Sequence, residues 1–428
     1  MDMLVLFGSL LGLIVIGMPI AFALCLSSTI TIVLFDTATL LFQVRSVVTA
    51  VSSFPLLAIP LFILAGDLMY TGGLSRRLVG LVDAFLGSLK ASLAYVTVCA
   101  STFFAAISGS GPATVAAIGS NVIPEMVSRG YPKTYGTSLS AAAGIVGVLI
   151  PPSIPFVMYG ISAEQSVGTL FIAGIIPGLL FSFAIAATAR YLYSKQNIQA
   201  KTQKFNKEHA VTSFKDAIWA LLAPVIVLGG IYGGIFSPTE AAAISVAYAI
   251  FLGVFIYREL TWKIIFETFA RSTKTTATCL GLVAFASTFG RLMTLQQVPV
   301  KLANMLLSIS DERIIILLII NIFLIFVGMF METIASIIIL TPILLPVVMK
   351  VGVDPIHFGV ILTANLAIGF CTPPLGVNLF VASGVSGLSV DSIIKGIIPY
   401  LGIMLAVLLL VSYLPALTLA LPGFLTGS

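Results

Sequence analysis

Apolar stretches long enough to cross a lipid bilayer recur from Met3 to Leu425, with no long polar block between them. A membrane-spanning helix needs roughly 20 mostly apolar residues, and we count about eleven or twelve such stretches. The chain is 59% hydrophobic and only 9% charged, a balance that soluble domains of this length do not reach. The sequence therefore predicts an all-α polytopic membrane protein.

The distribution of charge predicts the topology. The longest polar stretch, Ser194 to Lys215, contains five lysines, and the bias of Lys and Arg toward cytoplasmic loops places it on the cytoplasmic side. Met1 to Leu24 has no Lys or Arg, carries Asp2 and lacks the basic start of a cleaved signal. It is interpreted as a membrane helix whose N-terminus slightly favours the periplasm. The net charge of +5 is small, so nucleic acid is not expected as a partner.

Cysteine and histidine usage excludes several kinds of site. The four cysteines stand singly in apolar surroundings, which is typical of small core residues rather than of a zinc site or a disulfide framework. With only His209 and His357 in the chain, a histidine-based metal site or proton relay has few groups to use. No covalent cofactor is expected.

The two halves of the chain share a pattern of Gly and Pro at an offset of 222 residues. These residues fix backbone geometry, so a register kept over about 75 residues predicts duplicated architecture. Duplicated and often inverted halves are common in secondary transporters, which form their site where the halves meet. The matching pairs are Pro124 with Pro346, Gly130 with Gly352, Gly147 with Gly369, Pro151-Pro152 with Pro373-Pro374, and Gly174 to Pro177 with Gly396 to Pro399.

The first half contains two interruptions of its apolar runs. Ser108 to Pro112 reads SGSGP, which favours the tip of a re-entrant hairpin with Ser108, Ser110 and Thr114 in a polar pocket. The alternative is a kinked spanning helix whose hydroxyls bond to its own carbonyls. Farther along, prolines surround Ser153, which predicts a broken helix whose second part presents free N–H groups to an anion such as a substrate carboxylate.

The second half has counterparts at the same offset. Glu332 aligns with Ser110 and is the sole charge between Ile314 and Val348. A buried carboxylate there is costly unless it meets a cation, a donor or water; the alternative is a partner for Arg291 or a residue at the membrane edge. Thr372 and Asn378 flank the second Pro-Pro pair, where they are either site residues or helix caps.

This chemistry favours sodium as the coupling ion. Sodium binds hard oxygen ligands, which a helix break supplies through freed carbonyls and nearby hydroxyl or amide groups. The chain has no GxxxxGK[ST] motif for ATP. The predicted substrate contacts are Ser110, Ser153, Glu332 and Asn378.

Several long motifs, in order and across essentially the whole chain, resemble the DctM-type large membrane subunit of TRAP (tripartite ATP-independent periplasmic) transporters. The motifs are AIPLFILAGDLM from Ala58, SGSGPATVAAIGS from Ser108, LIPPSIPFVMYG from Leu149, SPTEAAA from Ser237 and TPPLGVNLFVASG from Thr372. The resemblance implies an elevator-type fold in the bacterial inner membrane, a small four-helix membrane subunit and a periplasmic binding protein as partners, and sodium-coupled uptake of a small-molecule carboxylate. It is nearest to members that transport sialic acid (N-acetylneuraminate).

The resemblance also implies boundaries and ion sites. Many members carry Asp where this chain has Glu332 and Ser where it has Gly111. The Glu332 side chain is longer than that of Asp, and Gly111 offers only its backbone to a ligand. The first sodium site would include Ser108, Ser110, Gly111, Thr114, Pro151 and Ser153, and the second Thr333, Ser336, Thr372 and Asn378. The expected units are a first repeat over 1–200 with scaffold helices, a hairpin near 100–125 and a broken helix near 138–162, a cytoplasmic linker over 201–215, and a second repeat over 216–428 with scaffold helices, a hairpin near 322–347 and a broken helix near 358–384.

Three other readings stay open at the level of sequence. A sodium:dicarboxylate symporter of similar design would work without a binding protein. An intramembrane enzyme would need a nucleophile with a base, or a metal site, and no plausible histidine or acid pair accompanies the serines. A passive channel would assemble its pore from a ring of subunits, whereas duplicated broken helices enclose a site within one chain.

Overall fold

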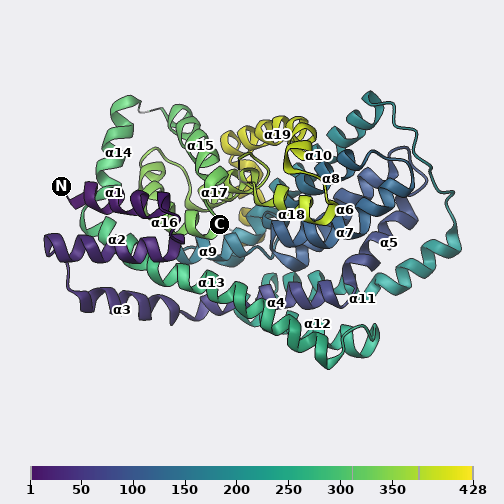
Figure 1. The fold of residues 1–428 in the computed structure, drawn as a ribbon, viewed down its shortest axis with the longest axis horizontal. Coiled ribbons are helices and arrows are strands. Elements are labelled where there is room, and N and C mark those ends of the chain that lie inside the picture. The colour runs from purple at the N-terminus through teal and green to yellow at the C-terminus, as the bar shows by residue number, and fades with distance from the viewer. Residues whose placement is uncertain (1, 311, 375, 427–428) are drawn as a thin grey trace.

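The computed structural model describes residues 2–310, 312–374 and 376–426, and within these ranges the chain forms helices and no strand (Figure 1). Eight of these helices are long and apolar enough to cross a membrane, and seven shorter apolar helices of 10–17 residues accompany them. The prediction of an all-α polytopic protein is confirmed.

The elements before the linker are α1 (Asp2–Val15), α2 (Ile20–Phe35), α3 (Leu40–Val51), η1 (Phe54–Leu57), α4 (Ala58–Thr71), α5 (Leu74–Leu86), α6 (Ser92–Ser108), α7 (Gly111–Ser128), α8 (Lys133–Ala143), η2 (Gly144–Val148), α9 (Ile154–Ser162) and α10 (Val167–Lys195). Those after it are α11 (Lys207–Tyr232), α12 (Pro238–Phe251), η3 (Leu252–Ile256), α13 (Trp262–Leu295), α14 (Val298–Ile309), α15 (Arg313–Phe330), α16 (Thr333–Lys350), α17 (Pro355–Gly369), α18 (Val377–Ser386), α19 (Val390–Tyr413) and α20 (Ala416–Thr426).

Each of the four sequence interruptions separates two helices. Three of the new helices begin with a side chain that accepts a hydrogen bond from the backbone N–H three residues on, which satisfies one of the unpaired N–H groups of a helix start. These capping residues are Ser110 for α7, Ser153 for α9 and Glu332 for α16. The fourth helix, α18, follows Gly376, whose φ of 47° lies in the left-handed region.

A kink does not account for the first interruption. Gly109 has a φ of 60° and Ser110 is extended, with φ −138° and ψ 128°. Neither conformation continues a right-handed helix. Consecutive helices α6 and α7 then pack against one another, which makes them a helical hairpin.

The helices of the two halves interlock. α7 and α16 begin 222 residues apart, at Gly111 and Thr333, as do α8 and α17, at Lys133 and Pro355. α18 from the second half packs against α7 and α8 of the first, while α9 from the first half packs against α16 of the second. Each set of broken elements therefore buries part of its surface against the other half.

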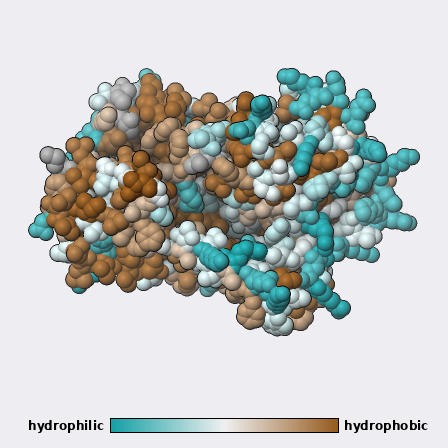
Figure 2. Space-filling view, viewed as in Figure 1, coloured by the Kyte–Doolittle hydropathy of each residue, from teal (hydrophilic) through white to brown (hydrophobic). Residues whose placement is uncertain are grey.

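Long helices flank this interlocked centre. α13 packs against α2, α3, α4 and α16, and α12 packs against α4, so that α3, α4, α12 and α13 run along one side of the molecule (Figure 1). Figure 2 shows apolar side chains gathered at the end formed by α1–α3 and α14, and hydrophilic side chains at the opposite end, where the linker between α10 and α11 lies.

The hydrophilic end is held by ion pairs of the buried Arg129 side chain and by the linker. Arg129, at the end of α7, binds Asp83 of α5 at 2.6 Å and Glu125 at 2.7 Å. Burial opposes its charge, but the hydrogen bonds and charges of these two carboxylates raise the pKa of Arg129. The linker crosses the same region, since the Lys201 N–H donates to the Arg129 carbonyl and the Gln203 N–H to the Gly87 carbonyl.

Candidate functional site

A cavity of about 320 Å³ lies where the four interruptions meet. Its walls come from the starts of α7, α9, α16 and α18, from the end of α17, and from α4 and α13. The lining residues are Ile63, Gly66, Asp67, Ser108, Gly109, Ser110, Gly111, Pro112, Ala113, Val148, Ile154, Pro155, Thr275, Cys279, Glu332, Thr333, Ile334, Phe370 and Val377.

The starts of four helices meet at this cavity and direct partial positive charge toward it. The first N–H groups of a helix have no partner within it, and the helix dipole places partial positive charge at that end. Such ends bind anions. No Lys or Arg side chain is among the described residues that line the cavity, whereas the carboxylates of Asp67 and Glu332 are.

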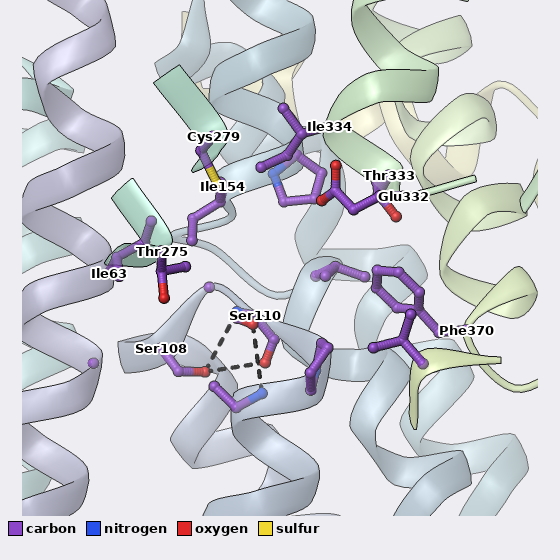
Figure 3. A pocket seen from close by; sticks show the side chains of 18 of the residues that line it. Ile63, Ser108, Ser110, Ile154, Thr275, Cys279, Glu332, Thr333, Ile334 and Phe370 are labelled. Carbon is purple, nitrogen blue, oxygen red and sulfur yellow. Dashed lines mark hydrogen bonds between the residues drawn. The ribbon is translucent and has the colours of Figure 1, made fainter. Parts of the chain in front are cut away.

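Ser108 and Ser110 lie close together at the first interruption (Figure 3). Ser108 Oγ lies 3.1 Å from Thr114 Oγ1, which donates to the Ser110 carbonyl at 2.8 Å. Ser108 and Ser110 line the cavity, while Thr114 lies buried behind them. These three residues, expected in one polar pocket, are brought together.

Gly147 of η2 closes this cluster from behind. A methyl group added there would lie 2.5 Å from the Ser110 carbonyl oxygen and 2.5 Å from Thr114 Oγ1. Three oxygens therefore sit within a cradle that only glycine leaves open. Hydroxyl and carbonyl oxygens are the hard ligands that sodium prefers, so this donor set fits the ion.

Glu332 faces the cavity across from Ser108 and Ser110 (Figure 3). Its carboxylate accepts a hydrogen bond from the Ala335 N–H at 3.1 Å and so caps α16. Arg291, considered from sequence as its partner, instead donates to Ser46 Oγ at 3.3 Å. Among the ion pairs of the described residues, none includes Glu332.

The remaining hydroxyls of the predicted second ion site differ in their hydrogen bonds. Thr333 lines the cavity, and its hydroxyl is buried without a hydrogen-bond partner. Ser336 and Thr372 donate to the carbonyls of Glu332 and Ile368, four residues earlier. The Thr333 hydroxyl thus has neither a donor nor an acceptor, while the Ser336 and Thr372 hydroxyls donate their protons to carbonyls and keep their oxygen lone pairs, as Thr114 does.

Ser153 and Asn378, predicted as substrate contacts, do not line the cavity. Ser153 is fully buried and donates to the Val148 carbonyl at 2.6 Å. Asn378 donates to the Ala141 carbonyl at 3.1 Å, while its Oδ1 is buried without a partner. A Cβ at Gly111 would lie 3.4 Å from that oxygen. Asn378 is thereby placed beside the first interruption rather than with Thr333.

The two Pro-Pro pairs lie outside the cavity lining. Pro151 precedes the start of α9, outside the cavity lining, and its peptide bond to Pro152 is cis, as is the bond between Pro373 and Pro374. Leu375, inside the second Pro-Pro motif, lies outside the described residues. Of the four predicted substrate contacts, Ser110 and Glu332 line the cavity.

Sequence reasoning missed the wall formed by α4 and α13. Asp67 accepts a hydrogen bond from Ser272 at 2.6 Å, and the Arg271 guanidinium lies 3.9 Å away. Thr275 and Cys279 lie one and two turns farther along α13 and also line the cavity. Asp67 carries the same signal as Glu332, a lone charge within an apolar run; the two α13 residues carry none.

Comparisons with known proteins agree with this architecture. The family model described as "Tripartite ATP-independent periplasmic transporter, DctM component" matches residues 7–417. The chain is 48% identical over 419 residues to the isethionate TRAP transporter permease protein DctMQ of Oleidesulfovibrio alaskensis, covering 98% of this chain but 66% of that protein, just under two thirds.

Two further relatives match along nearly their whole length. The C4-dicarboxylate TRAP transporter large permease protein DctM of Pseudomonas aeruginosa is 41% identical, with 94% of each chain covered. The sialic acid TRAP transporter large permease protein SiaM of Vibrio cholerae is 37% identical, with 97% of each covered. Among solved structures, the YdaH transporter of Alcanivorax borkumensis has a similar fold, with a TM-score of 0.63, 17% identity, and 87% of this chain and 88% of that one covered.

Proposed function

Since this chain belongs to the DctM component family of tripartite ATP-independent periplasmic transporters, we propose that it is the large subunit of a sodium-driven importer of a small organic anion. Membership makes it a multi-pass transport permease, and its relatives are permeases rather than enzymes.

The carboxylates of the cavity support sodium as the coupling ion. Four helix starts favour an anion, but the carboxylates of Asp67 and Glu332 repel one. Arg271 lies 3.9 Å from Asp67 and offsets part of its charge, whereas none of the ion pairs of the described residues includes Glu332. Cations bound beside the carboxylates and the Ser110 oxygens would remove this repulsion. Anion binding and sodium binding then favour one another, because each supplies the charge that the other needs.

Coupled sodium ions also supply the driving force. Moving one elementary charge across 100 mV is worth about 2.3 kcal/mol. If more sodium charges than substrate charges cross together, the membrane potential adds to the sodium gradient. An acid can then be accumulated without ATP.

An elevator motion accounts for the composition of the cavity walls. The interlocked unit of α6–α9 and α15–α18 supplies the helix starts, whereas α4 and α13 supply Asp67, Thr275 and Cys279. We propose that the interlocked unit moves as one body against α4 and α13. The bound ions and substrate would be carried from the periplasmic to the cytoplasmic face of the bacterial inner membrane.

The proposed partners are a small four-helix membrane subunit and a periplasmic binding protein that delivers the substrate. The family description names a tripartite transporter, which supports a further membrane component and a soluble one. The apolar surface over α1–α3 (Figure 2) is available for lipid or for such a subunit.

Sialic acid is the substrate predicted from sequence, and the similarity to SiaM at 37% identity supports it. The relatives at 48% and 41% identity are named for isethionate and C4-dicarboxylates. These compounds share a small size and an acidic group, so we propose an organic anion with a carboxylate or sulfonate group as the substrate class.

Uptake into proteoliposomes tests this proposal. The chain and its small subunit are reconstituted, and uptake of labelled sialic acid, isethionate and succinate is measured with and without an inward sodium gradient and a cognate binding protein. Uptake that needs both supports the tripartite importer. Sodium-dependent uptake without the binding protein identifies the autonomous symporter instead, and uptake indifferent to sodium overturns the coupling.

A further inference from the structure

A groove on the side of the molecule, between α6 and α10, lies apart from the transport cavity. It has a volume of about 640 Å³. Its walls are one face of α6 from Tyr95 to Phe103 and one face of α10 from Leu179 to Arg190. At 1.5 Å per residue, these stretches run for roughly 12–16 Å along the helix axes. The groove is thus long and follows the two helices.

The interior of the groove is apolar. Ser182, Ala186 and Ala187 are small, so α10 leaves space where α6 passes. Thr102 Oγ1 and Ser182 Oγ lie 2.9 Å apart and hydrogen-bond with each other. The third hydroxyl-bearing residue, Tyr95, lines the end that the groove shares with an adjoining hollow. Phe183 stands at the rim, 74% exposed. A ligand in this groove meets hydrocarbon rather than free hydrogen-bonding groups.

One end of the groove is cationic. Arg190 lines it, and an adjoining hollow of about 400 Å³ shares Arg190 and Tyr95 and extends to Lys90. No carboxylate is among the described residues lining either hollow. The ion pairs formed within residues 2–310, 312–374 and 376–426 leave out Lys90 and Arg190. Two cations are therefore available to a bound anion.

The charge bias of the linker places the cationic end of the groove on the cytoplasmic side. α10 ends at Lys195, directly before the lysine-rich linker that the bias of basic residues places inside. Lys90 lies two residues before α6, which begins at Ser92. Arg190 and Lys90 consequently lie near the headgroups of the cytoplasmic leaflet, while Phe103 and Leu179 lie deeper toward the apolar core. That leaflet carries the anionic lipids that basic pockets between membrane helices bind.

We propose that this groove is a binding site for one anionic phospholipid of the cytoplasmic leaflet. Its phosphate lies between Lys90 and Arg190, and one acyl chain lies along α6 and α10. The volume falls in the roughly 300–1,000 Å³ range of small-ligand sites. The pairing of two cations with an apolar channel matches the headgroup and acyl chain of an anionic phospholipid. Since α6 also ends at Ser108 in the transport cavity, the lipid contacts a wall of the transport machinery.

Quenching by brominated lipids tests this site. Trp219 and Trp262 are replaced by Phe, and Phe183→Trp places a single reporter at the rim. The full chain is reconstituted in phosphatidylcholine vesicles containing equal fractions of either brominated phosphatidylglycerol or brominated phosphatidylcholine. Phe326→Trp in the same background is the matched control, because Phe326 is 60% exposed on α15 and far in sequence from the groove.

The expected result is selective quenching at the groove. Brominated phosphatidylglycerol should bind beside the Phe183→Trp reporter more tightly than brominated phosphatidylcholine, by about fivefold for each cation, whereas the Phe326→Trp reporter should be quenched equally by both lipids. Lys90→Gln with Arg190→Gln should remove the preference. Equal quenching at position 183, a preference that survives both substitutions, or no quenching by either lipid would overturn the proposal; the last would mean that protein covers the groove.

Discussion

Glu332 illustrates how one side chain serves both the fold and the proposed chemistry. Its carboxylate caps α16 through the Ala335 N–H and also faces the cavity. A carboxylate held at membrane depth without a basic partner is costly unless a cation meets it. The position of Glu332 is thus more consistent with an ion site than with a structural salt bridge.

Replacing Glu332 by Gln separates these two roles. The Gln carbonyl can still accept the capping hydrogen bond, so the fold should be kept, but the negative charge is lost. We expect the sodium concentration for half-maximal uptake to rise by at least about tenfold, with a thermal midpoint near that of the wild type. Glu208→Gln, at an exposed position at the start of α11, is the control. An unchanged sodium dependence would contradict the role given to Glu332.

Asp67 permits a similar comparison on the opposite wall. Asp67→Asn keeps an acceptor for Ser272 but removes the charge, and we expect uptake to fall by about tenfold, equivalent to 1.4 kcal/mol. Ser272→Ala removes the 2.6 Å hydrogen bond and keeps the carboxylate, so its effect should be smaller. Initial uptake rates at saturating sodium measure both. If Ser272→Ala were the more damaging variant, Asp67 would act by positioning α13 rather than by its charge.

At the scale of helices, the close approach of η2 to α7 defines the first oxygen cluster. Gly147→Ala would force a methyl group against the Ser110 carbonyl and Thr114 Oγ1. Overpacking of this kind typically costs about 1–3 kcal/mol. We expect a thermal midpoint lower by several degrees and loss of sodium-driven uptake.

Gly229→Ala is the matched control for this prediction. Gly229 lies within α11, and a methyl group there would have no neighbour within 4 Å. Ala favours a helix over Gly by up to about 1 kcal/mol, so stability should be unchanged or slightly higher. Equal behaviour of the two variants would show that the approach at Gly147 is not tight in solution.

The helix breaks could be predicted from sequence because Gly and Pro act on the backbone at their own position. Gly and Pro clustered at Gly109 to Pro112 and at Pro151-Pro152 disfavour a continuous helix, and each cluster lies at a helix boundary in the structure. The partners of the side chains could not be predicted in the same way. Asn378 reaches Ala141, 237 residues earlier, and no local pattern reports such a contact.

The cavity wall formed by α13 shows the same limit. Thr275 and Cys279 look like ordinary residues of a long helix until the crossing of α13 with α4 and α16 places them at the cavity. Asp67 could have been predicted from sequence, because a single acid in an apolar run is the signal that identified Glu332. Ser153 lies behind the cavity, where it donates to the Val148 carbonyl. This hydrogen bond could not be predicted from the sequence.

At the scale of the whole molecule, Cys279 reports on the space between the interlocked unit and α13. We expect a small thiol-reactive methanethiosulfonate to inhibit uptake by modifying Cys279, and sodium together with substrate to slow the inhibition several-fold by filling or closing the cavity. Uptake rates after timed exposure measure this effect. Cys279→Ser should be insensitive, although Cys25, Cys99 and Cys371 remain present. Inhibition that persists in that variant would locate the sensitive thiol elsewhere.

The exchange of helices between the halves constrains how such a chain can arise. A half-length polypeptide would leave the surfaces that bind α9 or α18 uncovered, and could bury them only by donating its own helix to a second copy and receiving one in return. If the two halves arose by duplication, a half-length ancestor would have buried these surfaces as an exchanged dimer. Joining two copies through a linker leaves these contacts unchanged and fixes their ratio at one to one, after which the two sets of binding residues are free to diverge.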